Sequence, residues 1–306
     1  MLGELETTAG RRRGLVLVGG AAALWGTSGL TATVVYGRGV DPLTVAAWRM
    51  GLGAVALVVA LGLRSRRDAD MRLVALRVLD RSQRWRLVVV AAGLAAYQVG
   101  YFVAVDRAGV TIATLITLGS APLLVTVGER IITRRPAGRS TIAGVALALV
   151  GLVALVGAPG AAGPQVAAGA GFAVGSALGY ATMTLGGGGL GSRVGAERLT
   201  IAAFVGAAAL LIPLAAATTD LGIGADPVVL GALVYLAVVP TAVAYRLFFT
   251  GLPAIRATQA AVLVLLEPLV ATGLALLLLG ERLTLLGWSG AALLVAAVVL
   301  VTRTKR

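Results

Sequence analysis

The feature that most constrains this chain is a series of long apolar blocks that hold almost no charged residues. Residues 14–35, 145–156 and 262–280 are examples, and across the 306 residues 58% are hydrophobic while only 13% are charged. A soluble globular domain carries about 25% charged residues and roughly 45–50% apolar ones. About 20 apolar residues in a helix cross the roughly 30 Å hydrocarbon core of a bilayer. We therefore expect an all-α polytopic membrane protein.

Ten segments of the sequence are long and apolar enough to cross a membrane. They cover about residues 14–36, 43–63, 86–105, 109–131, 140–157, 166–185, 199–218, 228–249, 255–279 and 283–302. The first follows three arginines, as the apolar run of a signal peptide does, but it continues past Trp25 to Tyr36 without a small-x-small cleavage site. We therefore expect it to be retained as the first transmembrane helix.

The 26 basic residues lie unevenly on the two sides of these spans. With a cytoplasmic N-terminus, 20 of them lie in the cytoplasm. The other six are Arg38, Arg107 and Arg282 outside the membrane and Arg49, Arg130 and Arg246 within the spans. Because cytoplasmic loops of bacterial membrane proteins are enriched in Lys and Arg, we expect a multi-pass protein of the bacterial cytoplasmic (inner) membrane with both termini in the cytoplasm. Nucleic acid is excluded as a partner, since the basic residues border helices and form no basic face.

The composition also excludes several kinds of chemistry. The chain has no Cys and no His, so we expect no metal site and no cofactor. The acidic residues within the spans, Glu129 and Glu267, offer no nucleophile–base pair, so no catalytic residue is assigned and an intramembrane enzyme is disfavoured. The sequence has no ring of like charges typical of a channel and no G-x-x-x-x-G-K-[ST] motif for ATP. Any transport must therefore be driven by a gradient.

The two halves of the chain resemble each other at an offset of 146 residues. The offset aligns Pro122 with Pro268, Leu123 with Leu269, Thr126 with Thr272, Gly144 with Gly290, Ala146 with Ala292 and Leu147 with Leu293. Five helices per half is an odd number, so the second half enters the membrane from the opposite side. Inverted repeats of this kind build secondary transporters, with the substrate site near the midplane. We expect residues 1–157 to form the first five-helix repeat, residues 158–165 an external linker and residues 166–306 the second, inverted repeat.

Several motifs are similar to one known family. Ala-Leu-Trp-Gly-Thr-Ser at 23–28, Arg49, and Leu-Leu-Glu-Pro at 265–268 followed by Leu-Gly-Glu-Arg-Leu-Thr at 279–284 resemble the EamA branch of the drug/metabolite transporter superfamily. The resemblance covers nearly the whole chain. It implies ten helices in two inverted five-helix repeats around a central cavity for a small polar metabolite or drug.

The first half departs from this pattern at the Gly-Glu-Arg motif. Glu129 follows Pro122 by seven residues, whereas Glu281 follows Pro268 by thirteen. The repeat alignment places Arg135 at the position of Glu281. The resemblance therefore assigns no role to Glu129.

Glu267 is the acidic residue placed deepest in the expected spans. It lies about 13 residues, or about 20 Å, from the cytoplasmic start of its span, which is past the membrane midplane. A carboxylate at that depth is costly and usually functional. It could bind a cationic part of the substrate, or gain and lose a proton and so couple transport to the proton gradient. The alternative is a structural hydrogen bond to a neighbouring helix or to backbone freed by Pro268.

Four other charged residues lie within the spans or at their edges. Arg49 lies about 10 Å into a span entered from outside, where it could pair with Glu267, bind a substrate carboxylate or anchor the outer end by snorkelling. Glu129, Arg130 and Arg246 lie near the cytoplasmic interface, where we expect them to snorkel into water. An inner-gate salt bridge is the alternative for these three.

Aromatic and polar residues gather near the middle of the expected helices. These residues are Trp25, Thr27, Ser28, Tyr97, Gln98, Tyr101, Ser176, Tyr180, Thr182 and Tyr245. Trp25, Gln98 and Tyr180 lie near mid-depth, away from the interfacial belts where Trp and Tyr concentrate. We expect them to line a small-molecule cavity in which the rings could hold a cation, with ordinary interhelical packing as the alternative. The predicted substrate contacts are Trp25, Arg49, Gln98, Tyr101, Tyr180 and Glu267.

Proline and glycine suggest where the helices bend. Pro122, Pro240 and Pro268 remove hydrogen bonds within spans, so we expect each to kink its helix and to free a carbonyl. Residues 186–189 are four consecutive glycines, for which we expect a flexible cytoplasmic connection.

Together these patterns predict a secondary active transporter that moves a small metabolite or drug-like molecule by alternating access. The favoured version is an exporter of amino acids or related polar or aromatic compounds, with protons as the candidate coupling ion. Uptake of a metabolite is the alternative, ahead of an enzyme or a passive channel. The expected partners are the small-molecule substrate and membrane lipid, and the protein could be a monomer or a homodimer.

Overall fold

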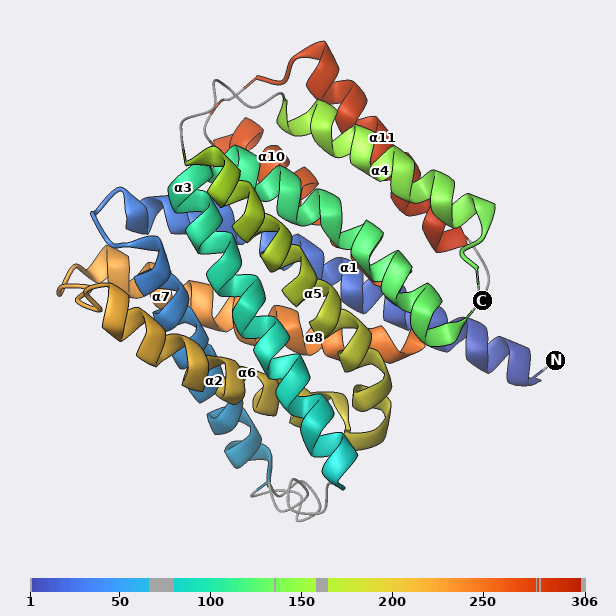
Figure 1. Ribbon diagram of the computed structural model, residues 1–306, viewed down its shortest axis with the longest axis horizontal. Coiled ribbons are helices and arrows are strands. Elements are labelled where there is room, and N and C mark those ends of the chain that lie inside the picture. Colours follow the sequence, from blue (N-terminus) through green and yellow to red (C-terminus); the bar gives the residue numbers. More distant parts are fainter. Residues whose placement is uncertain are drawn as a thin grey trace.

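The computed structural model describes residues 2–65, 80–134, 136–157, 165–278, 280 and 282–303, and this part of the chain is helical without strands. Figure 1 shows the helices as one bundle with both chain ends at the same end of it. The helices are α1 (Leu2–Tyr36), α2 (Pro42–Ser65), α3 (Arg81–Thr133), α4 (Arg139–Val156), α5 (Val166–Val194), α6 (Ala196–Thr218), α7 (Pro227–Ala237), α8 (Ala244–Gly251), α9 (Ala257–Leu263), α10 (Leu266–Leu278) and α11 (Leu285–Arg303). Most of the expected linker 158–165, together with Arg135 and Glu281, lies outside the described residues.

The described part contains nine helical stretches that are long and apolar enough to cross a membrane. One of them, α3, has 53 residues and a non-helical residue inside it, Gly109, with φ 80° and ψ 160°. A continuous helix of that length would be about 80 Å long, far more than a bilayer core, and glycine adopts this positive φ without strain. The two halves of α3 are therefore the third and fourth of the ten expected spans.

Two of the spans are built from more than one helical piece. A π-helical segment (Val238–Val243) joins α7 to α8, and a two-residue turn separates α9 from α10. The eighth span is thus α7, the π segment and α8, and the ninth is α9 with α10. The prediction of an all-α protein with ten membrane helices is confirmed.

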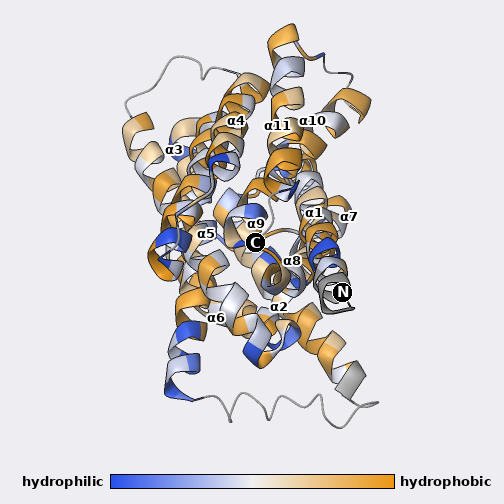
Figure 2. Ribbon diagram, turned by 90° about the vertical axis from the view of Figure 1, so that its right-hand side faces the viewer, coloured by the Kyte–Doolittle hydropathy of each residue, from blue (hydrophilic) through white to orange (hydrophobic). Residues whose placement is uncertain are grey.

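The outer surface of the bundle is apolar. Figure 2 shows hydrophobic residues along most of each helix. Large aliphatic side chains that are exposed include Val16, Val55, Ile131, Leu210 and Leu285. In water such a surface would be a large exposed hydrophobic patch, so it is the surface that faces membrane lipid.

Small residues bring the helices close together where the repeats meet. On α3 and α5, a methyl group added at Gly93 would lie 2.9 Å from the carbonyl oxygen of Gly179, and one at Gly100 would lie 2.8 Å from that of Phe172. On α1 and α8, a methyl group at Gly14 would lie 2.9 Å from the carbonyl oxygen of Gly251. Close backbone approach of this kind drives helix association in lipid, where apolar burial gives little.

The pair α4 and α11 displays the internal repeat directly. A methyl group at Gly290 would meet the carbonyl of Gly151 and the backbone of Leu155, and one at Gly144 would meet the carbonyl of Ala297 and the side chain of Val301. Each member of the first set is displaced by 146 residues from its counterpart in the second. The two helices therefore pack around a local two-fold axis in the register that the sequence predicts.

The two sides of the bundle differ in how α3 meets the ninth span. We call the side with both chain ends, the α3–α4 connection and the start of α9 the termini side. On the termini side α3 packs against α9, whereas α10 packs mainly on α1 and has hardly any contact with α3. Figure 2 places α10 with α1, away from α3. The fourth and ninth spans are thus joined on the termini side and separated on the other.

The run Gly186–Gly189 belongs to α5 and is not a loop, which corrects the expected flexible connection. A methyl group at Gly186 would lie 2.8 Å from Val90, and one at Gly187 would lie 2.6 Å from the Phe249 ring. Packing of neighbouring helices on this run overrides the low helix propensity of glycine.

Candidate functional site

The ninth span is interrupted next to Glu267. Helix α9 ends at Leu263 and α10 begins at Leu266. Pro268 has no N–H to donate to the carbonyl of Val264, four residues before it, and its ring crowds that carbonyl. The Val264 carbonyl instead accepts a hydrogen bond from the backbone N–H of Glu267 at 2.9 Å. Glu267 therefore lies in the first turn of a new helix in the interior of the bundle.

Glu267 is held close to α1. A methyl group added at Gly26 would lie 2.7 Å from the Glu267 carbonyl oxygen and 2.7 Å from Val270. The side chain is half-buried, and its Oε2 is buried without a hydrogen-bond partner among the described residues. A carboxylate oxygen in that condition has lost its hydration without gaining a donor, which is costly.

Arg49 projects from α2 toward the eighth span. Its Nε donates a hydrogen bond to Thr241 Oγ1 at 3.1 Å. Thr241 follows Pro240 in the π-helical segment, and such segments are frequent at functional sites. Among the described residues no ion pair joins Arg49 to Glu267, so the expected alternative of a direct pair is not what the structure contains.

The two charges nevertheless share a neighbourhood. Glu267 lies within electrostatic range of the hydroxyls of Tyr101 and Tyr245, and so does Arg49. Tyr97 and Tyr180 are also within range of Glu267. The structure therefore gathers an acid, a base and several phenols from five helices in the interior.

A continuous cluster of buried aromatic rings lies beside these charges. Its members are Trp25, Tyr97, Tyr180, Phe204, Tyr245, Phe248 and Phe249. The Trp25 ring lies 4.8 Å from that of Tyr245, and Tyr180 lies 5.6 Å from Tyr97, both in edge-to-face geometry. Such pairs contribute about 0.5–1.5 kcal/mol beyond area burial. The rings of Trp25 and Tyr180 are thus packed inside the cluster.

Sequence reasoning missed the three phenylalanines of this cluster. Tyr245, Phe248 and Phe249 lie at positions i, i+3 and i+4 of α8, which is the spacing of one helix face. That spacing was the signal available in the sequence for Phe248 and Phe249, whereas Phe204 lies on α6.

Two buried nitrogen donors in or beside the aromatic cluster have no hydrogen-bond partner among the described residues. They are the indole Nε1 of Trp25 and the amide Nε2 of Gln98, which are 6% and 3% exposed as residues. More than about nine in ten buried polar groups in proteins are hydrogen-bonded, so each exception needs an explanation. Glu267 Oε2 and the hydroxyls of Tyr180 and Thr184 are likewise buried without a hydrogen-bond partner among the described residues.

Four other predicted residues, Thr27, Ser28, Tyr101 and Ser176, are already hydrogen-bonded within the protein. Tyr101 Oη shares a hydrogen bond with Thr114 Oγ1 at 3.0 Å, across the bend at Gly109. The hydroxyls of Thr27, Ser28 and Ser176 donate to the backbone carbonyls of Leu24, Trp25 and Tyr97. Hydroxyls commonly do this in membrane helices, and these are not free to bind a ligand as donors.

The three predicted kink positions differ from one another. Pro268 follows the break between α9 and α10, and Pro240 lies in the π-helical segment. Pro122 lies within α3, which continues through it, and its carbonyl accepts a hydrogen bond from Thr126 Oγ1 at 2.6 Å. The repeat-related Pro122 and Pro268 therefore differ in their effect, since the helix continues through Pro122 and is interrupted just before Pro268.

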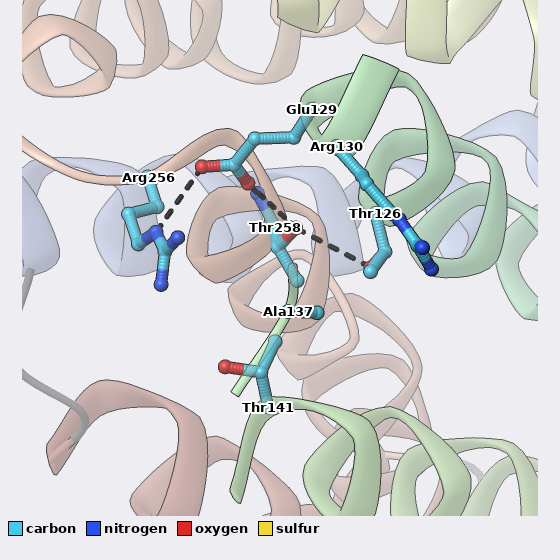
Figure 3. A pocket seen from close by; sticks show the side chains of 7 residues that line it. All are labelled: Thr126, Glu129, Arg130, Ala137, Thr141, Arg256 and Thr258. Carbon is cyan, nitrogen blue, oxygen red and sulfur yellow. Dashed lines mark hydrogen bonds and ion pairs between the residues drawn. The ribbon is translucent and has the colours of Figure 1, made fainter. Parts of the chain in front are cut away.

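A second polar cluster lies on the termini side, where α3 ends and α9 begins (Figure 3). Glu129 Oε1 accepts from Arg256 Nε at 3.2 Å, and Glu129 Oε2 accepts from the Thr258 backbone N–H at 3.0 Å and from Thr258 Oγ1 at 2.7 Å. The Glu129 side chain is 15% exposed. The expectation that Glu129 snorkels into water is therefore wrong, because its carboxylate is bound by the first turn of α9.

The other two edge charges behave differently from Glu129. Arg130 is exposed and points away from Glu129 (Figure 3). Arg246 Nη2 lies 3.5 Å from Glu197 Oε1, and both side chains are partly exposed. Arg246 thus has an ion-pair partner on α6 and a side chain that is still partly exposed.

A groove of about 610 Å³ opens beside the Glu129 cluster on the termini side. It is lined by residues that include Glu129, Thr133, Thr184, Gly188, Gly189, Ser192, Leu252 and Arg256. Thr184 lies one helical turn beyond Tyr180 on α5. The groove therefore extends from the termini side toward the aromatic cluster.

On the other side of the bundle, the loops of the two halves are tied together. Arg38 Nε lies 2.9 Å from Asp226 Oδ2, and Trp48 Nε1 donates to the carbonyl of Leu221 at 2.9 Å. The backbone N–H of Val228 and then the charge of Arg38 hold the pKa of Asp226 below its ordinary value. These contacts fix the α1–α2 corner against the α6–α7 connection.

Comparison with known proteins agrees with this architecture. The model of the EamA-like transporter family matches residues 12–157 and again residues 167–303. A relative from Bacillus subtilis (strain 168), named "Uncharacterized transporter YwfM", is 31% identical over 288 residues, which cover 94% of this chain and 92% of the relative. A solved crystal structure, 20% identical in sequence, superposes with a TM-score of 0.79 over 95% of this chain and 97% of its own.

Two family matches, one in each half, account for the repeat that the α4 and α11 packing displays. The relative covers almost the full length of both chains, and its printed name is that of a transporter. The protein is thus a multi-pass membrane transporter and not an enzyme, and it belongs to the EamA-like transporter family.

Proposed function

We propose that the protein is a secondary transporter that exports a small zwitterionic metabolite, of which an amino acid is the simplest, across the cytoplasmic membrane. Both termini face the cytoplasm in this proposal. Residues 1–157 and 166–306 are the two inverted repeats, joined outside the membrane by residues 158–165, and they exchange inward-open and outward-open arrangements.

One observation carries the substrate class. Arg49 and Glu267 have opposite charges and lie within electrostatic range of the same tyrosines, yet they form no ion pair with each other. Two unpaired charges in the low dielectric of a membrane protein interior are costly. A zwitterion would give each of these charges a partner, because its ammonium group can pair with Glu267 and its carboxylate can bind the Arg49 guanidinium in a bidentate manner.

The aromatic cluster supports the rest of the proposal. Trp25 Nε1 and Gln98 Nε2 are buried donors without a protein partner, and both can donate to a carboxylate or another polar ligand group. Tyr97 and Tyr101 lie within electrostatic range of Glu267, and aromatic rings there would favour an ammonium group or an apolar side chain. We propose Trp25, Arg49, Gln98, Tyr101, Tyr180 and Glu267 as the substrate contacts.

Glu267 is also the proposed coupling residue. When the site is empty, protonation removes the cost of an unpaired charge, and arrival of a cationic group favours release of that proton. A proton moving inward would then exchange for a substrate moving outward. On the termini side α3 packs against α9, whereas on the other side it is separated from α10. A substrate could leave between α3 and α10 on that other side, which supports export.

The first test is a ligand screen followed by transport in proteoliposomes. Thermal unfolding of the purified protein is measured with amino acids, organic cations, sugars and nucleosides, because a ligand that binds the folded state raises its melting temperature. We expect a zwitterion to give the largest shift and an imposed pH gradient to drive its movement. A shift given only by sugars or nucleosides would contradict the zwitterion, and transport indifferent to the pH gradient would contradict proton coupling.

A further inference from the structure

The termini-side groove combines three features that the proposed central site does not use. It is lined by both charged members of the Glu129 cluster, its inner end reaches Thr184 beside Tyr180, and its wall includes Gly188 and Gly189. Its volume of about 610 Å³ lies within the roughly 300–1,000 Å³ typical of small-molecule sites. The size of the groove is therefore suited to a small molecule.

The glycines in the wall keep the groove open. A methyl group at Gly189 would have nothing within 4 Å, and one at Gly188 would make ordinary contact with Leu252 at 3.6 Å. Packing therefore does not require glycine at either position, although glycine has a lower helix propensity than alanine. The absence of side chains here leaves space that an alanine, leucine or larger residue would occupy.

Glu129 ties the two helices that border the inner end of the groove. We use the name latch for the contacts of Glu129 with Arg256 and Thr258. The carboxylate accepts three hydrogen bonds, one of them from a backbone N–H in the first turn of α9. The latch therefore holds the end of α3 against the start of α9.

The internal repeat shows that the latch exists on one side of the bundle alone. At the offset of 146 residues, Glu129 corresponds to Ala275, Arg256 to Val110 and Thr258 to Ile112. All three counterparts are apolar, and α3 and α10 are separated there. The polar contacts between α3 and α9 on the termini side thus have no counterpart at the repeat-related positions on the other side.

We propose that the groove is the cytoplasmic vestibule of the transport path and that Glu129 is the residue that closes it. Substrate enters the groove from the termini side, and release of Glu129 from Arg256 and Thr258 lets α3 and α9 part, so that the groove joins the central site at Thr184 and Tyr180. This inference rests on the proposed transport cycle for its direction, but it does not depend on which substrate is carried.

Single cysteines report this opening directly, because the natural chain has none. Thr184→Cys places a thiol at the inner end of the groove, and Thr272→Cys places one on α10, on the separated side. Both are tested with a membrane-impermeant thiol reagent added to either side of vesicles of known orientation. In the parent we expect slow reaction at position 184 and faster reaction at position 272.

Glu129→Gln removes the charge and Thr258→Val removes one donor of the latch. We expect each to raise the reaction rate at position 184 about tenfold and to lower that at position 272, because a hydrogen bond to a charged group is equivalent to a tenfold change or more in an equilibrium. Glu197→Gln, which removes the partner of Arg246 at the membrane edge, is the matched control and should change neither rate. Rates within twofold of the parent for both latch variants would overturn the role of Glu129.

The groove itself is tested by filling it. Gly189→Trp should abolish transport of the ligand identified in the screen and block reaction at position 184, while position 272 still reacts at the parent rate. Gly171→Trp, at an exposed position of the same helix outside the groove, is the matched control and should leave all three measurements unchanged. Normal transport by the folded Gly189→Trp variant would place the path elsewhere. The thiol-reactivity measurements need no substrate. A screen in which no zwitterion binds would therefore contradict the proposed substrate without contradicting the proposed vestibule.

Discussion

Two carboxylates on repeat-related spans differ in their hydrogen bonding to the rest of the protein. Glu129, at the end of the fourth span, accepts three hydrogen bonds from Arg256 and Thr258. Glu267, in the middle of the ninth span, has a buried oxygen with no partner in the described part of the chain. A carboxylate satisfied by the protein holds two helices together. One that the protein leaves unsatisfied retains binding capacity for something from outside, at a cost in stability.

The largest expected effect separates the two carboxylates by function. Glu267→Gln should abolish transport driven by a pH gradient, since the amide cannot exchange a proton. The melting temperature of the ligand-free protein should not fall, because an unsatisfied charge is removed. Gradient-driven flux and counterflow exchange in proteoliposomes check this.

Exchange distinguishes the two roles proposed for Glu267. If the residue only carries protons, exchange without a gradient survives in Glu267→Gln, and if it binds the ammonium group, exchange is lost as well. Wild-type gradient-driven transport by the variant between pH 5.5 and 8 would contradict both roles and would leave a structural hydrogen bond beside Pro268.

The second contrast is between Trp25, whose ring is packed in the aromatic cluster, and Gln98, whose amide nitrogen has no hydrogen-bond partner among the described residues. Trp25→Ala removes a ring that packs on Tyr245 and Phe248, so it should destabilise the protein by about 3–5 kcal/mol, as large-to-small core substitutions do. Gln98→Ala removes a donor that has no partner, so it should weaken ligand binding with little loss of stability. Thermal unfolding and binding are measured for both variants. Equal destabilisation by the two would mean that Gln98 is a packing residue.

The third effect concerns Glu129 and stability. Glu129→Ala should lower the stability of the ligand-free protein by about 2 kcal/mol. The substitution removes the hydrogen-bond acceptor of Arg256 and of the Thr258 N–H, which are partly buried. Unfolding in detergent measures this, with Glu197→Ala as the control at a more exposed ion pair. A loss no larger than that of the control would show that the Glu129 contacts contribute little.

The smallest effect is expected at the tied loops opposite the termini. The pKa of Asp226 is lowered from 3.8 by the Val228 N–H and then by Arg38, so its carboxylate stabilises the folded state above that pH and the contribution disappears as the pH falls through the lowered value. The difference in melting temperature between the parent and Asp226→Asn should therefore shrink as the pH is lowered from 6 toward 3. A difference that grows over this range would be contrary to the capping role.

The sequence predicted the helices well and the contacts poorly, for physical reasons. Membrane helices follow from local hydropathy, and even the division of α3 agrees with the break expected before Gly109. The helical glycines at 186–189 were not foreseen, because their conformation depends on Val90 and Phe249 from other spans. The repeat alignment gave no reason to single out Glu129.

The two polar sites illustrate the same limit. Glu129 and its partners are 127 and 129 residues apart in the chain, and nothing local marks them as neighbours. Glu267 and Arg49 stood out because a charge within an apolar span is conspicuous by itself. Their roles as substrate contacts stay predictions.

The central claim is that Glu267 and Arg49 bind the two ends of one zwitterion, and a comparison of two ligands tests it most directly. Binding of phenylalanine and of phenethylamine, which lacks the carboxylate, is measured for the parent and for Arg49→Gln. We expect Arg49→Gln to weaken phenylalanine binding about tenfold or more, since a charge-assisted hydrogen bond is lost, and to leave phenethylamine binding unchanged. An equal loss for both ligands, or none for either, would contradict the claim that Arg49 binds the carboxylate opposite Glu267.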